Sequence, residues 1–254
     1  MLEPFIYEFG YDWPWTRGHL LLLVSFGTLF GVACWRRWPR WIAAVGGVFS
    51  AWALAGALIV HYVLDFNRPM RLPTAAFLPI GEGRVLDAGA GSGRATVAVL
   101  RERPRSTVTA LDIYSDYFGI SDNTPKRLHT NARIAGVEPR VEVVTGDMRA
   151  MPLPSSSFAA ALSVAAIDHL GRDDVATALR EIERVLEPGG QFLLVTVNVD
   201  PWLRVAMPLP HAHGYFSVKQ RVERWRGLIE DAGLEVTEEG TRPGTLYLLA
   251  RKPG

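Results

Sequence analysis

The sequence predicts an α/β fold, in which helices cover both faces of a parallel sheet, preceded by an α-helical transmembrane hairpin. Three observations lead to this prediction. From residue 84 onward, apolar strand patterns alternate with amphipathic helix patterns, which is the order that builds parallel sheets. Residues 85–93 place a glycine-rich turn directly after the first of these strands. Between Gly18 and Leu64 the only formal charges are three arginines, a composition typical of membrane-spanning segments.

The elements of the α/β domain follow one another along residues 84–254. Helices are expected at 95–102, 124–135, 173–186 and 219–232. Gly136 and Gly233 stop the second and fourth of these helices, and Pro188-Gly189-Gly190 stops the third. Strands are expected at 85–87, 107–112, 141–144, 158–164 and 191–197, with a final antiparallel pair at 234–239 and 246–250.

Residues 1–64 are expected to form the membrane hairpin. Its helices are predicted at about 19–35 and 41–64, which are runs of 17 and 24 residues without a formal charge. A spanning helix needs about 20 apolar residues, with about 17 as the lower limit. Six of the eight tryptophans lie in this segment, and tryptophan favours membrane interfaces. The predicted localisation is therefore a membrane, crossed by two helices, with the lipid bilayer as a partner.

Small residues recur along both predicted helices and favour close helix packing in lipid. Such faces also permit the chain to form oligomers in the bilayer. The alternative is a soluble apolar hairpin that covers the α/β domain. The small residues are Gly27 and Gly31 in the first helix, and Ala43, Gly47, Ala51 and Ala55 in the second.

The glycine-rich turn indicates a nucleotide-type binding site. Gly89, Gly91 and Gly93 allow the backbone to approach a ligand, and the helix that follows presents free N–H groups to it. About twenty residues further on, a second strand ends in Asp112, which is placed to accept hydrogen bonds from ribose hydroxyls. The turn therefore predicts a cofactor that carries a ribose.

Two features separate this turn from a dinucleotide site. Arg94 stands where such sites have a third glycine, and Asp87 would repel phosphate but suits a cationic, phosphate-free cofactor. The stretch RVLDAGAGSGR resembles motif I of the class I S-adenosylmethionine-dependent methyltransferases. The stretches MPLPSSSFAAALSVAAIDHL and LEPGGQFLLV resemble later strands of that family, so the resemblance extends over about residues 80–252. Ala159 departs from the family, which usually has an aspartate there.

This resemblance implies a Rossmann-like mixed seven-stranded sheet and S-adenosyl-L-methionine as the cofactor. It also implies that the acidic residue after the third strand lies near the adenine amino group. The methyltransferase domain would occupy residues 84–254, behind a proline-rich linker at 65–83 that holds it close to the bilayer. The expected cofactor-binding residues are Asp87, Gly89, Ala90, Gly91, Gly93, Asp112, Ile113, Gly146, Asp147 and Met148.

The acceptor chemistry is expected after the fourth and fifth strands, because ligands bind at the carboxyl ends of parallel strands. The stretch 198–216 mixes apolar side chains with a few polar ones, as small-molecule pockets do. A histidine there, or after the fourth strand, can act as a general base. The alternatives are a surface loop that touches the bilayer, or a metal bound by two histidines; no metal is expected, since no carboxylate completes that ligand set. The candidate catalytic residues are Asp168, His169, His211, His213 and Tyr215.

These observations predict a membrane-anchored methyltransferase that acts on a lipophilic small molecule or a lipid. One alternative is a soluble thiol, amine or hydroxyl acceptor, which activity of a fragment without residues 1–64 would favour. Another is a non-catalytic cofactor-binding interaction module. The net charge of +1 and the lack of basic runs argue against nucleic acid as a partner, and the single cysteine excludes an internal disulfide. The catalytic domain is expected to face the cytoplasm, where the cofactor is made; arginines at both ends of the hairpin leave the orientation undecided by charge.

Overall fold

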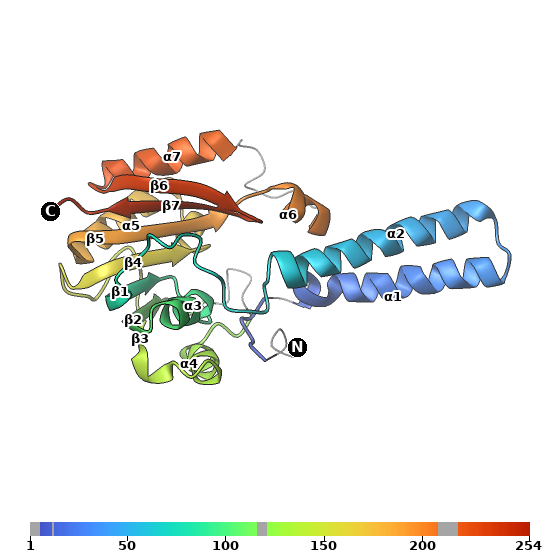
Figure 1. Cartoon of the computed structure of the whole chain (residues 1–254), viewed down its shortest axis with the longest axis horizontal. Helices are drawn as coiled ribbons and strands as arrows, with labels where there is room; N and C mark the ends of the chain where they lie inside the picture. Colours follow the sequence, from blue (N-terminus) through green and yellow to red (C-terminus); the bar gives the residue numbers. More distant parts are fainter. Residues whose placement is uncertain (1–5, 12, 116–120, 208–217) are drawn as a thin grey trace.

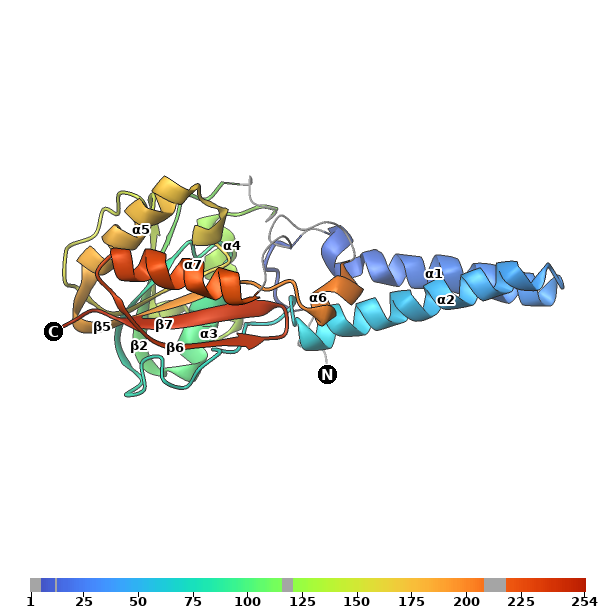
Figure 2. The ribbon, with the colours of Figure 1, turned by 90° about the horizontal axis from the view of Figure 1, so that it is seen from above.

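The computed structural model describes residues 6–11, 13–115, 121–207 and 218–254. An α/β domain occupies one end of the molecule, and a two-helix hairpin projects from it (Figure 1). The hairpin also extends away from the sheet in the view from above (Figure 2). The hairpin therefore does not cover the α/β domain in the way that the alternative prediction expected.

The hairpin consists of α1 (Trp13–Trp35), α2 (Arg40–Leu58) and a π-helical turn, η2 (Ile59–Val63), that continues α2. α1 begins six residues earlier than predicted, because Pro14 is tolerated in a first helical turn, where no backbone N–H is needed. In the most apolar 18-residue stretch of each helix, only 11% of α1 and 28% of α2 are buried. By length and composition both helices could cross a bilayer core of about 30 Å, at about 1.5 Å per residue.

Glycines set the contact between the two helices, and of the predicted small residues Gly27 and Gly47 take part in it; a Cβ added at Gly47 would lie 3.4 Å from the Phe30 ring. An added Cβ at Gly46 would lie 2.9 Å from the backbone nitrogen of Phe30, so the helices touch closely there. Gly27 approaches Ser50, whereas Gly31 faces open space. The buried small residues of α2 are Gly46, Ala53, Gly56 and Ala57, not the predicted row at 43, 47, 51 and 55.

A seven-stranded sheet forms the centre of the α/β domain, in the order β3-β2-β1-β4-β5-β7-β6. β1 to β5 pair in parallel, and β7 is antiparallel to both of its neighbours. This arrangement confirms the predicted mixed sheet. The strands are β1 (Glu82–Ala88), β2 (Arg105–Asp112), β3 (Val141–Thr145), β4 (Phe158–Val164), β5 (Leu186–Val197), β6 (Glu235–Arg242) and β7 (Thr245–Arg251).

Helices cover both faces of the sheet. α5 and α7 share a hydrophobic core with one face, and α3 and α4 pack on the other. The linker belongs to this second face, since Leu72, Phe77 and Leu78 are buried in the same core, so the domain is not on a loose tether. The helices are α3 (Arg94–Glu102), α4 (Pro125–Ile134), α5 (Arg172–Val185) and α7 (Val218–Asp231), with short turns η4 (Glu138–Arg140) and η5 (Ile167–His169).

Two elements around β5 differ from the predicted ones. The strand begins at Leu186, so Pro188-Gly189-Gly190 lies within it, at a register shift against β4. After the strand, α6 (Pro201–Ala206) forms where only a loop was expected. Its start follows the usual rules, because the Asp200 side chain accepts a hydrogen bond from the Leu203 amide and Pro201 occupies the first turn.

The carboxyl ends of the parallel strands point toward the base of the hairpin (Figure 1). The chain order reverses between β1 and β4, which is where open α/β sheets bind ligands. α6 lies against the base of α2, and the Trp52 indole Nε1–H donates to the carbonyl of Val205, at 2.8 Å. The expected ligand site and the hairpin therefore meet at one end of the domain.

Candidate functional site

A cavity of about 1090 Å³ lies at the carboxyl ends of the parallel strands. The turns after β1, β2, β3 and β4 form its polar side. The base of the hairpin, the linker and α6 form the other side, where the apolar Val63, Leu64, Phe66, Leu203 and Met207 lie on the wall beside the charged linker residues Asp65, Arg68 and Arg71. Pockets that enclose one small ligand measure roughly 300–1,000 Å³, so this cavity has room for a cofactor and part of an acceptor.

The glycine-rich turn, residues 89–94, is called the cofactor loop below. Gly89, Gly91 and Gly93 all have positive φ, the left-handed region that favours glycine. A Cβ at Gly89 would collide with the Cβ of Ala166, and one at Gly93 would lie 2.9 Å from Leu128. Gly89, Ala90 and Gly91 line the cavity, whereas Gly93 ends the loop as the N-cap of α3.

Asp112 ends β2 beside the cofactor loop and lines the cavity. Its carboxylate accepts hydrogen bonds from the amides of Gly91 (2.8 Å) and Tyr114 (2.7 Å) and from the Asn123 side chain (3.2 Å). These bonds fix the carboxylate where a ribose could be held. Ile113, the next residue, also lines the cavity and is half exposed.

Asp87 lies beneath the cofactor loop and is fully buried, away from the cavity wall. The Thr96 hydroxyl donates to its Oδ2 at 2.6 Å, while Oδ1 has no hydrogen-bond partner among the described residues. Burial raises the pKa of Asp87 to about 7, and the charge of Asp112 adds to the rise. A cation bound above the loop would relieve this penalty, so the site fits a cationic cofactor better than a phosphate.

The turn after β3 forms the next part of the polar wall. Gly146, Asp147 and Met148, which were predicted to contact the cofactor, all line the cavity. Asp147 forms an ion pair with Arg149, at 2.6 Å, and hydrogen bonding from Arg149 lowers its pKa. The Asp147 carboxylate can therefore accept a hydrogen bond from a donor such as an adenine amino group, although it also pairs with Arg149.

The candidate catalytic residues fall into two groups. His169, in η5, lines the cavity. Asp168 does not, because its carboxylate turns to β5 and accepts a hydrogen bond from the Thr196 hydroxyl. His211, His213 and Tyr215 lie outside the described residues. Among the described residues, no three His, Cys, Asp or Glu side chains gather closely enough to hold a metal ion.

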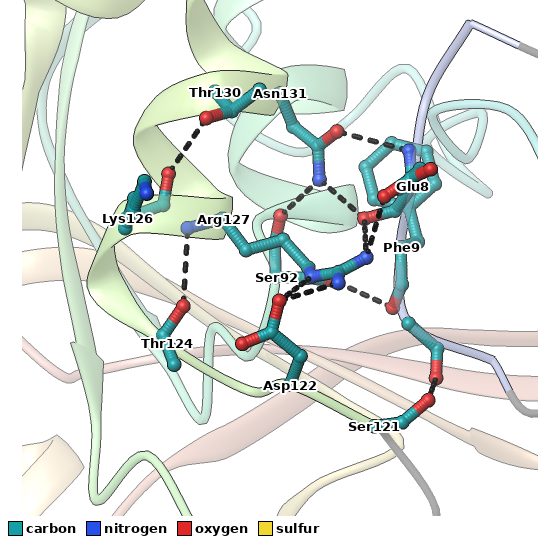
Figure 3. Close-up of polar contacts among 11 residues, drawn as sticks. Glu8, Phe9, Ser92, Ser121, Asp122, Thr124, Lys126, Arg127, Thr130 and Asn131 are labelled. Carbon is teal, nitrogen blue, oxygen red and sulfur yellow. Dashed lines mark hydrogen bonds and ion pairs between the residues drawn. The ribbon is translucent and has the colours of Figure 1, made fainter.

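A segment that precedes the hairpin, residues 7–11, also reaches the cavity and is called the strap below. It was not predicted from the sequence. Phe9 and Tyr11 line the cavity, and Phe9 is buried. Asn131 and Ser92 hold the strap by hydrogen bonds to its backbone (Figure 3). The signal was the alternation of Tyr7, Phe9 and Tyr11 with other residues, a strand-like pattern.

Comparison with known proteins decides what kind of site this is. A family model described as a methyltransferase domain matches residues 85–190, which include the cofactor loop, Asp112 and the β3 turn. Residues 85–190 of this chain are therefore similar to a methyltransferase domain. The cofactor of the chain is S-adenosylmethionine, and the buried Asp87, the glycines and Asp112 fit that cationic, ribose-containing molecule.

Relatives of the methyltransferase domain act in different reactions. A fatty-acid O-methyltransferase from Mycolicibacterium smegmatis is 36% identical over 141 residues, which are 54% of this chain and 47% of that protein. A ubiquinone/menaquinone biosynthesis C-methyltransferase from Methylobacterium nodulans is 34% identical over 149 residues, 58% of this chain and 49% of that protein. The chain thus spans about half the length of these curated relatives.

Solved structures share the fold of the methyltransferase domain. An O-methyltransferase family protein from Burkholderia thailandensis superposes with a TM-score of 0.56 at 17% identity, over 82% of this chain and 60% of that one. A SAM-dependent methyltransferase from Aquifex aeolicus gives 0.52 at 17% identity, over 66% and 81% of the two chains. At these identities the likeness concerns the fold alone.

Proposed function

We propose that the chain transfers the methyl group of S-adenosylmethionine to a lipophilic small molecule or lipid, and that the hairpin holds it in a membrane. The observation that carries this proposal is the continuity of the cavity. Its polar side holds the cofactor loop, and its other side carries apolar side chains of η2 and α6 at the base of the hairpin. A lipophilic acceptor could therefore reach the cofactor from the level of the bilayer surface.

The hairpin supports membrane attachment through its exposed apolar surface. Large side chains along both helices are open to their surroundings, including Val24 at 67% and Val48 at 66%. Trp35 and Trp41 are exposed at the tip, beside arginines, as in the aromatic belts of membrane proteins. Exposure of this apolar surface to water would cost a large free energy, whereas contact with lipid would not.

α6 extends the apolar surface onto the methyltransferase domain. Leu203 and Ala206 pack with Ile59 and Val60 at the base of the hairpin. The opposite side of this short helix exposes Trp202, at 48%. In our proposal α6 rests at the membrane interface beside the entrance of the cavity.

Two of the relatives support a lipophilic acceptor, whereas a third is named as a malonyl-[acyl-carrier protein] O-methyltransferase. One is named as a fatty-acid O-methyltransferase, and another as a C-methyltransferase of ubiquinone and menaquinone biosynthesis. Fatty acids and quinones with long side chains are lipophilic. Because the chain covers only about half of each of these two relatives, its own acceptor stays a proposal.

The chemistry asks little of the protein beyond alignment, because the bound cofactor supplies an activated methyl group. The cofactor loop and Asp112 would hold the cofactor, and Asp147 and Met148 would lie beside its adenine. His169 lines the same cavity and is our candidate general base for an acceptor that must lose a proton. Apolar side chains of η2 and α6, such as Val63 and Leu203, would exclude water around the acceptor.

The cytoplasmic orientation of the domain is also a proposal, based on the supply of the cofactor. Two spans then put both ends of the hairpin on the cytoplasmic side. Glycosylation or protease-protection mapping of a tag at the hairpin tip, after Trp38, would test this directly. A tip that is reached from the cytoplasm would contradict the orientation.

The acceptor is tested by radiolabel transfer in native membranes that contain the protein. Membranes are incubated with methyl-labelled S-adenosylmethionine and divided into organic-extractable, aqueous and protein fractions. We expect label in the organic fraction and its loss in an Asp112→Ala variant. Label in the aqueous fraction would favour the soluble-acceptor alternative, and cofactor binding without any transfer would favour the non-catalytic one.

Deletion of residues 1–64 no longer distinguishes these alternatives. The fragment would lack the strap, η2 and their cavity residues Phe9, Tyr11, Tyr62, Val63 and Leu64. It could lose activity on a soluble acceptor because the site is incomplete. The fractionation of the full chain avoids this ambiguity.

A further inference from the structure

We infer that both ends of the hairpin are structural parts of the cofactor site, which is complete only when the strap and the start of the linker close around the cofactor loop. The inference goes beyond the proposed acceptor and holds whichever acceptor is used. It rests on a closed ring of contacts between three segments: residues 7–11, residues 64–68 and residues 89–94.

Asn131 joins the strap to the cofactor loop. Its side chain accepts from the Glu8 amide at 3.1 Å and donates to the Glu8 carbonyl at 2.9 Å, as a neighbouring β-strand would. The same Nδ2 group donates to the Ser92 carbonyl at 2.9 Å, and Asn131 is only 1% exposed. The Ser92 hydroxyl donates a hydrogen bond to the Phe9 carbonyl at 2.6 Å (Figure 3). Loop and strap are therefore held by buried bonds from both directions.

Arg127 and Ser121 fasten the outer edge of the strap. The Arg127 guanidinium pairs with Glu8 at 3.1 Å, and also with Asp122. The Ser121 amide donates to the Gly10 carbonyl at 2.8 Å. These contacts are more exposed than the Asn131 contacts, so we assign them a smaller share of the attachment.

Arg94 joins the linker to the other side of the cofactor loop. Its guanidinium donates to three backbone carbonyls just beyond η2, those of Leu64 (3.2 Å), Asp65 (3.0 Å) and Arg68 (3.0 Å). Arg94 directly follows the last glycine of the loop and begins α3. A planar guanidinium with five N–H donors can serve three carbonyls at once, which an ammonium group on a flexible stem cannot do as rigidly.

The ring closes where the strap meets the linker. The Tyr11 and Phe66 rings lie 5.0 Å apart, and Arg94 lies within 6 Å of both rings. Tyr11 stands just before α1, and Phe66 just after η2. The Ser92, Arg94 and Tyr11 contacts thus run directly between the cofactor loop and the ends of the hairpin, or between these ends, and Asn131 of α4 bridges the loop and the strap.

This arrangement makes Asn131 and Arg94 positioning residues for the cofactor. They hold the loop against the strap and the linker, whose residues Phe9, Tyr11 and Phe66 complete the cavity wall. Whatever separates the two ends of the hairpin would also open the cofactor site. We therefore expect cofactor affinity to depend on segments that lie outside residues 85–190.

The test is titration of the full chain, reconstituted in lipid nanodiscs, with S-adenosylmethionine. Deletion of residues 2–11 leaves the loop, Asn131 and Arg94 intact, and we expect it to raise the dissociation constant about tenfold or more. Asn131→Asp, which replaces the donor by a second acceptor, and Arg94→Lys should each act in the same direction. Amide hydrogen exchange at residues 89–93 should rise in each variant, while exchange in β4 and β5 stays unchanged.

Matched controls lie on the same two helices. Thr130→Ala neighbours Asn131 but bonds only to Lys126 on its own helix, and Arg101→Lys lies two turns beyond Arg94 on α3. Both should keep the affinity of the wild-type chain. If Asn131→Asp fails to fold, the strap deletion decides. A folded deletion variant that binds the cofactor within twofold of the wild-type chain would overturn the inference.

Discussion

At the scale of single residues, three aspartates near the cofactor loop have different surroundings. Asp87 is buried below the loop, Asp112 is held on the cavity wall by backbone amides, and Asp147 is shared with Arg149. The free-energy cost of an ionised carboxylate is highest at Asp87, because the group lacks water there and one of its oxygens has no hydrogen-bond partner among the described residues. Such a cost is typical of a site that needs a negative charge for its ligand.

The buried carboxyl predicts a pH dependence of stability without the cofactor. The folded-state pKa of Asp87 is about 7, above the value of 3.8 in the unfolded chain, so the folded state binds the extra proton between these values. The free energy of unfolding should therefore fall as pH rises from about 4 to about 7, by on the order of 4 kcal/mol from this group. Thermal unfolding across this pH range measures it. Asp87→Asn should flatten the decline, and an equal decline in the variant would contradict the assignment.

His169 should matter for the chemical step rather than for cofactor binding. If it is the general base, His169→Gln should lower kcat by about 10²- to 10⁴-fold and leave the dissociation constant of S-adenosylmethionine unchanged. His129→Gln is the control, because His129 lies on α4 beside Glu138. A kcat equal to that of the wild-type chain would exclude His169 as the base and direct attention to His211 and His213.

At the scale of elements, the hairpin depends on a close helix contact at Gly46. Gly46→Val would press a side chain against the backbone of Phe30, a misfit that costs about 1–3 kcal/mol in packed interiors. The midpoint of thermal unfolding in detergent should fall by several degrees. Gly31→Val is the control, since a Cβ there has nothing within 4 Å. Equal effects of the two substitutions would mean that the helices do not pack as described.

Elements whose signals are local were predictable from the sequence. The strand, glycine turn and helix at residues 82–102 and the final antiparallel pair appear as predicted, because propensity, periodicity and glycine positions agree there. The predicted row of small residues in α2 was only partly right, since alanines and glycines recur on more than one face of that helix and only Gly47 of the row meets Phe30. α6 was missed although Asp200 and Pro201 form a regular helix start.

The cofactor side of the site was more predictable than its other walls. Motif residues such as Gly89 and Asp112 come from one short stretch of the chain, and both line the cavity. The strap and the base of the hairpin reach the same cavity through contacts such as Glu8 to Asn131, which are 123 residues apart. No local pattern fixes such a pairing, because it depends on how the hairpin leaves the domain.

At the scale of the whole molecule, the two-helix hairpin and the methyltransferase domain meet at the site rather than at a distance from it. α6 links the two, with Trp202 exposed beside the base of the hairpin. Trp202→Glu should therefore reduce methylation of an organic-extractable acceptor several-fold, because it places a charge at the proposed membrane interface. Transfer of label into that fraction measures the effect.

The matched control for Trp202 is Ile80→Glu. Ile80 is 71% exposed and precedes β1, at the end of the sheet away from the hairpin. The Ile80→Glu substitution should leave transfer of label to the organic-extractable acceptor unchanged, and both variants should bind S-adenosylmethionine as the wild-type chain does. Equal transfer by the two variants would mean that α6 does not meet the membrane.

The central claim is that this chain methylates a lipophilic acceptor. The most direct measurement is mass spectrometry of lipid extracts, after incubation of the purified full chain in nanodiscs with native membrane lipids and S-adenosylmethionine carrying a CD₃ group. We expect a lipid-soluble product in which one CD₃ group replaces one hydrogen, and we expect this product to be absent with Asp112→Ala. A CD₃ product found only among water-soluble compounds, with none in the lipid extract, would contradict the claim.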